Sequence, residues 1–165
     1  MGRIIARLIA GILLVLAATG IAFVAGMRTK SPLVLDAVRR TSRAMKPLAL
    51  KSAGTPGAYA SVIRHVGRTT GRAYETPVGA VATDDGFVIA LPYGPNTDWL
   101  KNVLASGSAT IVDEGSTYDV DRPEVLPITE ADHHFSPQDR RAHGVFGVDQ
   151  CLRVRRLGPG QPVTG

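Results

Sequence analysis

The sequence predicts a small antiparallel β-barrel with short helices, of mainly β (α+β) class, preceded by one helix that is long enough to cross a membrane. About six short runs have the residue preferences of strands, and turn signals separate them. Near the N-terminus, residues 8–27 form an uncharged apolar run of the length that spans the hydrocarbon core of a bilayer. The pattern alone does not separate one type of barrel from another.

The N-terminal apolar run admits two interpretations. Arg3 and Arg7 precede it, as basic residues do in a secretory signal peptide. The run is longer than the roughly 7–15 apolar residues of a signal peptide, and no clean cleavage site follows it, which favours an uncleaved anchor over residues 1–30. More basic residues follow the run than precede it. The positive-inside rule therefore predicts a single-pass membrane protein with its C-terminal domain in the cytoplasm.

The formal charge of +5 belongs to the N-terminal part of the chain. Residues 1–51 hold nine Lys/Arg and one acidic residue, whereas the remainder holds ten Lys/Arg and thirteen Asp/Glu. With only 5% aromatic residues as well, this distribution argues against nucleic acid as a partner. The single cysteine, Cys151, excludes an intrachain disulfide and a cysteine-built metal site.

The stretch after the apolar run predicts a helix. Ser31 and Pro32 are typical of a helix start, apolar residues then recur at helical spacing over 33–48, and Pro47 is expected to end the helix. This amphipathic helix either lies on the membrane surface or over a pocket, or it simply packs on the domain. With the Gly/Pro/Ser-rich residues 51–57 it forms a helix-and-linker segment over residues 31–57.

The folded domain is expected over residues 58–157, followed by a disordered tail over residues 158–165. Asp84-Asp85-Gly86 is a strong hairpin signal, Pro77 indicates a bulge or an edge strand, and Thr97 is placed to cap a helix. The expected strands cover residues 59–66, 74–83, 87–91, 108–113, 117–122 and 152–155, and the expected short helices cover residues 98–105, 130–135 and 137–143.

Two stretches of this domain are candidates for one small-molecule site. The first is a glycine-bracketed basic turn, Gly67-Arg68-Thr69-Thr70-Gly71-Arg72. Its glycines can take positive φ, its threonines supply hydroxyls, and its arginines supply forked donors suited to phosphate or carboxylate. The alternative is a polar hairpin loop that is merely exposed to water.

The second stretch runs from Tyr93 to Asn102. Trp99, the only tryptophan, either walls a pocket or belongs to the core, and Asn102 either bonds a ligand or caps neighbouring backbone. Tyr93 is a candidate catalytic residue and Tyr74 a second candidate donor, because a phenol can deliver a proton to a developing oxyanion; the alternative for each is a residue of the pocket wall or the barrel rim.

The order and spacing of three motifs resemble the deazaflavin-dependent nitroreductase family over about 100 residues, from Tyr59 to Leu157. The motifs are the run 62–72 around the basic turn, Thr76-Pro77-Val78, and the run 98–107 that begins Asp98-Trp99-Leu100-Lys101-Asn102. The resemblance implies a split β-barrel of the flavin-reductase, FMN-binding type. It also implies coenzyme F-420, a deazaflavin with a phospholactate and polyglutamate tail, as the cofactor, with FMN as the alternative.

The resemblance further implies hydride transfer to quinones, nitro compounds or activated alkenes, and a possible homodimer. The cofactor-binding residues that it implies are Gly67, Arg68, Thr69, Thr70, Gly71, Arg72, Pro77, Val78, Trp99 and Asn102. A deazaflavin carries its own hydride chemistry, so the protein need only bind, orient and exclude water. The competing hypothesis is a non-catalytic barrel that binds a deazaflavin, flavin, haem or lipid.

The sequence departs from the family pattern at three places. Thr69 and Thr70 stand where the family has Lys-Ser, and Tyr74 stands where an arginine is common. The residues before Trp99 also differ from the usual Gly-Gly-x-x-x-His-Pro. Part of the anion clamp must therefore come from other cations, and the sequence offers Arg64, Arg68 and Arg72.

Overall fold

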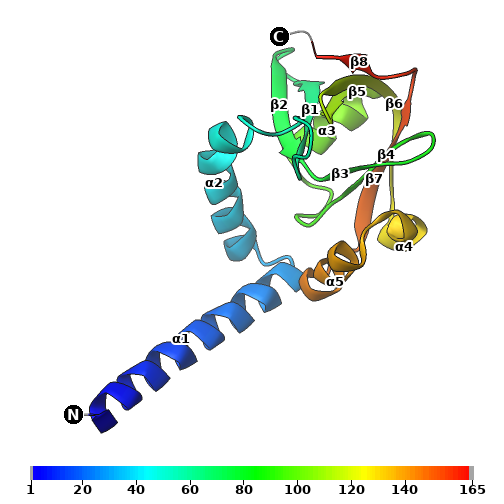
Figure 1. Ribbon diagram of the computed structural model, residues 1–165. Coiled ribbons are helices and arrows are strands. Elements are labelled where there is room, and N and C mark those ends of the chain that lie inside the picture. Colours follow the sequence, from blue (N-terminus) through cyan, green and yellow to red (C-terminus); the bar gives the residue numbers. More distant parts are fainter. Residues whose placement is uncertain (1, 164–165) are drawn as a thin grey trace.

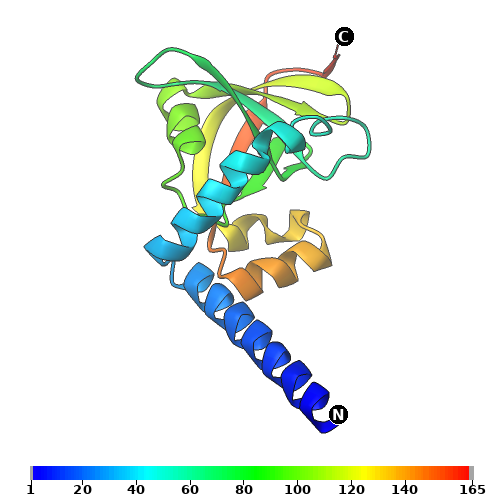
Figure 2. The same ribbon diagram turned by 90° about the vertical axis from the view of Figure 1, so that its left-hand side faces the viewer.

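The computed structural model describes residues 2–163, without the side chains of residues 2–4 and 6–8. A long N-terminal helix, α1 (Gly2–Arg28), projects away from the folded domain (Figure 1). Helix α2 (Pro32–Ala49) then runs crosswise to α1 and back toward the domain (Figure 2). The remaining elements form the domain itself.

The domain is one eight-stranded antiparallel sheet with short helices, in which the strand order is β2-β1-β5-β6-β7-β4-β3 and β8 pairs with β6. The strands are β1 (Ser61–Val66), β2 (Ala73–Val78), β3 (Ala80–Ala82), β4 (Gly86–Ala90), β5 (Ser108–Asp113), β6 (Ser116–Pro127), β7 (Gln150–Arg156) and β8 (Gln161–Pro162). The helices are α3 (Asp98–Ser106), α4 (Ile128–Ala131), the 3-10 helix η1 (Asp132–His134) and α5 (Pro137–Phe146).

The sheet curls into a split barrel. Its two outer strands in the pairing order, β2 and β3, are consecutive in the chain and only Gly79 separates them, so the sheet must curl to bring its edges together. The strand expected over residues 74–83 is therefore two strands, and Pro77 lies on an edge strand as predicted. The predicted fold class is confirmed.

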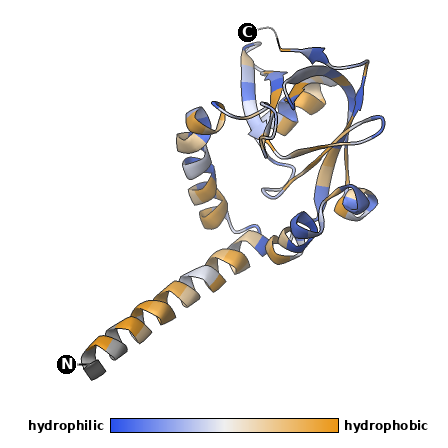
Figure 3. Cartoon of the chain, viewed as in Figure 1, coloured by the Kyte–Doolittle hydropathy of each residue, from blue (hydrophilic) through white to orange (hydrophobic). Residues whose placement is uncertain are grey.

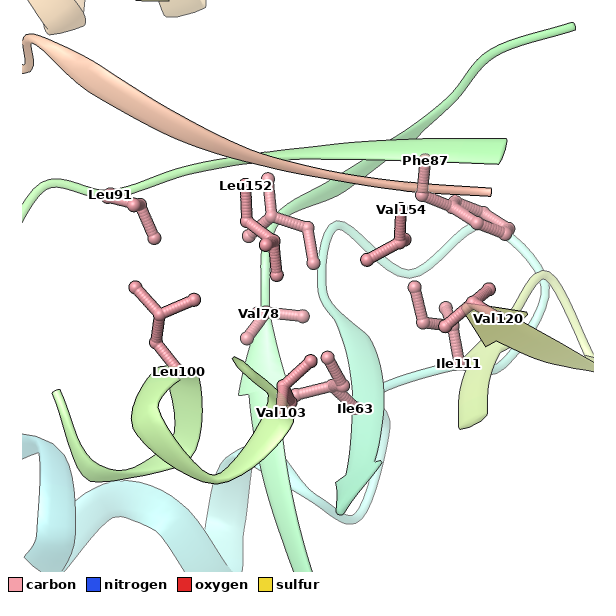
Figure 4. Close-up of a cluster of buried hydrophobic side chains, with 11 residues drawn as sticks. Ile63, Val78, Phe87, Leu91, Leu100, Val103, Ile111, Val120, Leu152 and Val154 are labelled. Atoms are coloured by element: carbon pink, nitrogen blue, oxygen red, sulfur yellow. The ribbon is translucent and has the colours of Figure 1, made fainter. Parts of the chain in front are cut away.

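The barrel interior is filled by aliphatic side chains and Phe87 (Figure 4). Leu100 and Val103 of α3 are fully buried and close one end of this cluster. Strand β4 is apolar on both faces: Phe87 points into the barrel, whereas Val88 joins a second cluster with residues of α4 and α5. The fully buried side chains of the interior are Ile63, Phe87, Ile89, Leu91, Leu100, Val103, Ile111, Val120, Leu152 and Val154.

Within α1, the segment Ile9–Arg28 is apolar and long enough to cross a membrane, and such helices occur both as membrane spans and as signal sequences (Figure 3). The C-terminal end of α1 docks on α5. Phe23 meets Phe146 edge-on at a ring-centroid distance of 6.3 Å, and Arg28 Nη1 donates to the carbonyl of Gly144 at 2.7 Å. Lys30, just beyond α1, donates through Nζ to the carbonyl of Gly147 at 2.9 Å.

Two expectations were wrong in detail. Pro47 does not end its helix, because α2 continues for two more residues, to Ala49. Pro47 lies in the last turn, where its missing N–H removes only one helical hydrogen bond. The tail is not disordered at residues 161 and 162, which pair with β6 as β8; residues 164 and 165 lie outside the described residues. The segment 51–57 also lies against the barrel, since Gly54 exchanges backbone bonds with Ala60 and Gly115 at 2.7 Å each.

Candidate functional site

The basic turn is the hairpin loop between β1 and β2. Gly67 N donates to the carbonyl of Arg72 and Gly71 N donates to the carbonyl of Gly67, both at 2.8 Å. Gly71 has a φ of +65°, as predicted, but Gly67 is not among the described residues with positive φ. Gly67 leaves room instead, because a Cβ there would lie 2.7 Å from Thr70 Oγ1 and 2.8 Å from Cε2 of the Tyr74 ring, so both side chains would have to move.

Arg68 joins this turn to helix α3. Its guanidinium donates through Nη1 to Asn102 Oδ1 at 2.9 Å and through Nη2 to Asp98 Oδ1 at 3.3 Å, and its backbone N also donates to Asn102 Oδ1 at 3.2 Å. Asn102 therefore caps backbone, which is one of its two predicted roles. The amide nitrogen of the same side chain, Asn102 Nδ2, continues the network by donating to His65 Nδ1 at 3.2 Å. The two candidate stretches are thus in direct contact.

His65 is a buried, neutral member of the same network. Because Asn102 Nδ2 can only donate, Nδ1 of His65 accepts, and its Nε2–H is left to donate to Thr76 Oγ1 at 3.2 Å. Burial lowers the pKa of His65 below its usual 6.5, and the positive charge of Lys46 lowers it further. Lys46 belongs to α2, so this helix lies within electrostatic reach of the barrel mouth.

The buried neutral His65 makes stability depend on pH. Its pKa is lower in the folded chain, so between the two pKa values the unfolded chain binds more protons. The free energy of unfolding is therefore expected to fall as the pH drops below about 6.5, the unfolded value. Urea unfolding of the wild type and of His65→Gln at a series of pH values measures this, and the variant should show a smaller loss in acid. Equal losses in both proteins would remove His65 from the account.

A basic cavity of about 770 Å³ lies between the barrel mouth and α2. The domain contributes residues that include Gly67, Arg68, Thr69, Thr70, Tyr93, Trp99 and Asn102, and α2 contributes Arg39, Ser42, Arg43, Met45, Lys46 and Ala49. Its walls carry four Lys/Arg side chains and a single carboxylate, that of Asp98. The α2 residues were not predicted as site residues, because their basic spacing is visible in the sequence but nothing in the sequence places that helix over the turn.

A second cavity, of about 600 Å³, adjoins the first and is lined mainly by apolar side chains. It lies between the barrel and α5, with Val78, Ile89, Phe135 and Phe146 among its walls. Its size is that of a typical small-molecule site. Four residues border both cavities, so the two spaces meet at one place: Pro77, Tyr93, Thr97 and Trp99.

Unsatisfied polar atoms also mark this region. Among the residues that the structure describes, two buried side-chain polar atoms lack a hydrogen-bond partner, Thr97 Oγ1 and His143 Nδ1. Both residues line the apolar cavity. Thr97 is the N-cap residue of α3, as predicted, but its hydroxyl makes no cap bond and so stays free for another partner. Buried polar atoms are normally paired, so this donor set fits a bound molecule that carries polar groups.

The structure brings most of the predicted site residues to these cavities. Val78 lines the apolar cavity, whereas Gly71 and Arg72 line neither and only shape the loop. Trp99 packs on the barrel core and also lines both cavities, and its role as a wall of the cofactor pocket stays a prediction. Arg64, offered as a further clamp residue, pairs with Glu75 at 2.9 Å and also lines neither cavity.

No protein-family model and no curated protein matches this sequence. Solved structures similar to this chain include an F420-dependent reductase. This F420-H2 dependent reductase, FDR-A, shares 14% identity, with 59% of this chain and 94% of that chain covered and a TM-score of 0.44. An FAD-binding protein from Mesorhizobium loti shares 17% identity, with 68% and 88% covered and a TM-score of 0.45. The heme storage protein HutZ from Vibrio cholerae shares 12% identity, with 64% and 87% covered and a TM-score of 0.47.

Proposed function

We propose that this protein is a membrane-anchored oxidoreductase that transfers a hydride from reduced coenzyme F-420 to a lipophilic acceptor, namely a quinone, a nitro compound or an activated alkene. One observation carries the proposal: a basic cavity and an apolar cavity meet at Tyr93, Thr97 and Trp99. A redox carrier with an anionic tail and a flat ring needs the first cavity, and a lipophilic acceptor needs the second.

The cofactor would be held by the basic turn and the walls beside it. The backbone N–H groups and hydroxyls of Thr69 and Thr70 and the guanidinium of Arg68 suit its anionic tail. Pro77 and Trp99, which border both cavities, would flank its ring at their junction, and Val78 would meet the ring edge from the apolar side. When bound, the reduced deazaflavin supplies a hydride, and the acceptor takes that hydride together with one proton. We assign the delivery of this proton to the phenol of Tyr93, which borders both cavities.

The acceptor would occupy the apolar cavity. Phe146 lines this cavity and also contacts Phe23 of α1, so one wall adjoins the helix that would cross the bilayer. A bilayer-soluble acceptor would therefore reach the site over a short distance. The unpaired Thr97 Oγ1 and His143 Nδ1 offer partners for the oxygens of a quinone or a nitro group.

The proposed anchor is α1, with the domain on the cytoplasmic side. The apolar segment Ile9–Arg28 supports the span, and the excess of basic residues after it supports this orientation. Leu33 and Leu48 of α2 are 84% and 58% exposed, and contact with the bilayer surface would cover them.

The test of the proposal is turnover by the full chain in lipid nanodiscs. With reduced coenzyme F-420 and menadione, we expect oxidation of the cofactor to depend on the protein. Ala142→Trp, which fills the apolar cavity from α5, should slow this reaction at least tenfold and leave cofactor affinity unchanged. Gln138→Trp, an exposed position on the same helix that does not line that cavity, is the matched control.

The outcomes of this experiment separate the candidate functions. Tight binding of the cofactor without oxidation would favour a carrier. Tighter binding of FMN than of coenzyme F-420 would identify a flavin as the cofactor instead. If the chain bound neither cofactor, the oxidoreductase assignment would be wrong.

A further inference from the structure

We infer that α2 supplies the second half of the anion clamp: Arg39, Arg43 and Lys46 hold the phosphate and carboxylate groups of the cofactor tail from the wall opposite Arg68. The inference rests on the proposed function and adds a binding role for a helix outside the barrel. All four cations line the one basic cavity, Arg68 from the hairpin loop and the other three from α2.

The part of α2 that lines the cavity carries three cations beside Met45 and Ala49, and Leu35, near the start of the helix, is buried. Arg39, Arg43 and Lys46 are spaced at i, i+4 and i+7, which places them on one face of a helix, and the cavity shows that this face points at the barrel mouth. Leu33 and Leu48 are exposed instead. Leu35 lies one turn before Arg39 on the same face, so packing accounts for the start of the helix but gives no role to the three cations that follow along the cavity.

The three α2 cations have no acidic partner. None of the ion pairs among the described residues includes them, and the one acid of the cavity, Asp98, already pairs with Arg68. Like charges at this spacing repel one another along a helix. The positive charge of Lys46 is also felt at His65, whose pKa it lowers. A polyanion bound between the two walls would neutralise these cations and so remove their mutual repulsion.

The cations of α2 also compensate for the lack of a second cation of the basic turn in the cavity. Thr69 and Thr70 line the cavity and carry no charge, and Arg72 does not line it, so Arg68 is the one cation that the turn contributes to the cavity. The cations of α2, on the opposite wall of the cavity, supply the positive charge that the turn lacks. Three flexible cations on α2 match a tail that bears several negative charges along its length.

The test compares two ligands on two variants of the full chain in nanodiscs. The ligands are intact coenzyme F-420 and a tail-less deazaflavin that ends at its ribityl chain, and equilibrium dialysis measures both affinities. Arg43→Ala/Lys46→Ala should weaken binding of the intact cofactor about tenfold or more and leave binding of the tail-less form within twofold. The matched control is Arg40→Ala/Lys51→Ala, which removes two exposed cations of the same segment that do not line the cavity.

Each outcome is decisive. An unchanged affinity of Arg43→Ala/Lys46→Ala for the intact cofactor, with wild-type binding intact, overturns the inference and leaves the proposed function standing. Equal losses for both ligands, or equal losses in the control, also overturn it, since the effect would then not come from contacts with the tail. If the wild type binds neither ligand, the proposed function fails, and the inference fails with it.

Discussion

Replacement of Arg68 by alanine is expected to weaken the binding of coenzyme F-420 by more than tenfold. The guanidinium is held in place by Asn102 and Asp98, and no hydrogen bond among the described residues uses its Nε. A positioned fork of this kind contributes roughly 1.5–3 kcal/mol for each hydrogen bond to a charged group, and about 1.4 kcal/mol corresponds to tenfold in affinity. Equilibrium dialysis of wild type and variant measures the change.

Arg72→Ala is the matched control for this prediction. Arg72 belongs to the same turn and carries the same charge, but it is exposed and lines neither cavity, so its loss should change affinity less than twofold. Arg68→Lys separates charge from shape, because it keeps the cation and loses the fork. Thermal unfolding of each variant checks that the contact with α3 survives. Equal losses at both arginines would mean that the turn attracts the tail only through its overall charge.

Gly86→Ala is expected to lower the free energy of unfolding by about 3 kcal/mol, at the upper end of the usual cost of overpacking. A Cβ at Gly86 would overlap the carbonyl oxygen of Val154 and lie 2.9 Å from the Cα of Arg155. Both of these atoms are backbone, so no rotamer change relieves the clash. The pairing of β4 with β7 would have to shift, and this pairing closes the barrel beside β3.

The control for this substitution is Gly79→Ala. A Cβ at Gly79 meets no heavy atom within 4 Å, and Gly79 is not among the described residues with positive φ. We expect its effect on stability to stay within about 0.5 kcal/mol. Denaturant unfolding followed through Trp99 compares the two variants. Similar stabilities would mean that the strands next to Gly86 adjust more freely than their close spacing indicates.

The local elements could be predicted because each has a local cause. Asp84-Asp85-Gly86 marks its hairpin directly, and α3 follows from Thr97, Asp98 and the apolar spacing after them. The length of β6 could not be predicted. It continues past Arg122, which has a positive φ of 50°, because its pairing with β7 runs on across a register shift between Asp121 and Glu124, whereas its pairing with β5 stops at Asp121. Such a bulge depends on the neighbouring strands.

For the candidate site, too, some residues could be predicted from local sequence and others could not. Residue type and turn chemistry identified the loop at Arg68 and the segment at Trp99, which the structure places on one cavity. The roles of the other site residues depend on which side chains the fold buries. Nothing local distinguishes Arg68 from Arg72, marks His65 as a buried neutral group, or turns the cations of α2 toward the barrel. These features depend on how the hairpin twists and how α2 packs, and neither has a sequence signal of its own.

Emission from Trp99 gives the most direct measurement, since it is the only tryptophan in the chain and it borders both cavities. Titration of the full chain in nanodiscs with coenzyme F-420, corrected with a free tryptophan standard, should show saturable quenching. Its midpoint should match the dissociation constant from equilibrium dialysis. Binding in dialysis with unchanged Trp99 emission would place the cofactor away from the junction of the two cavities and contradict the account.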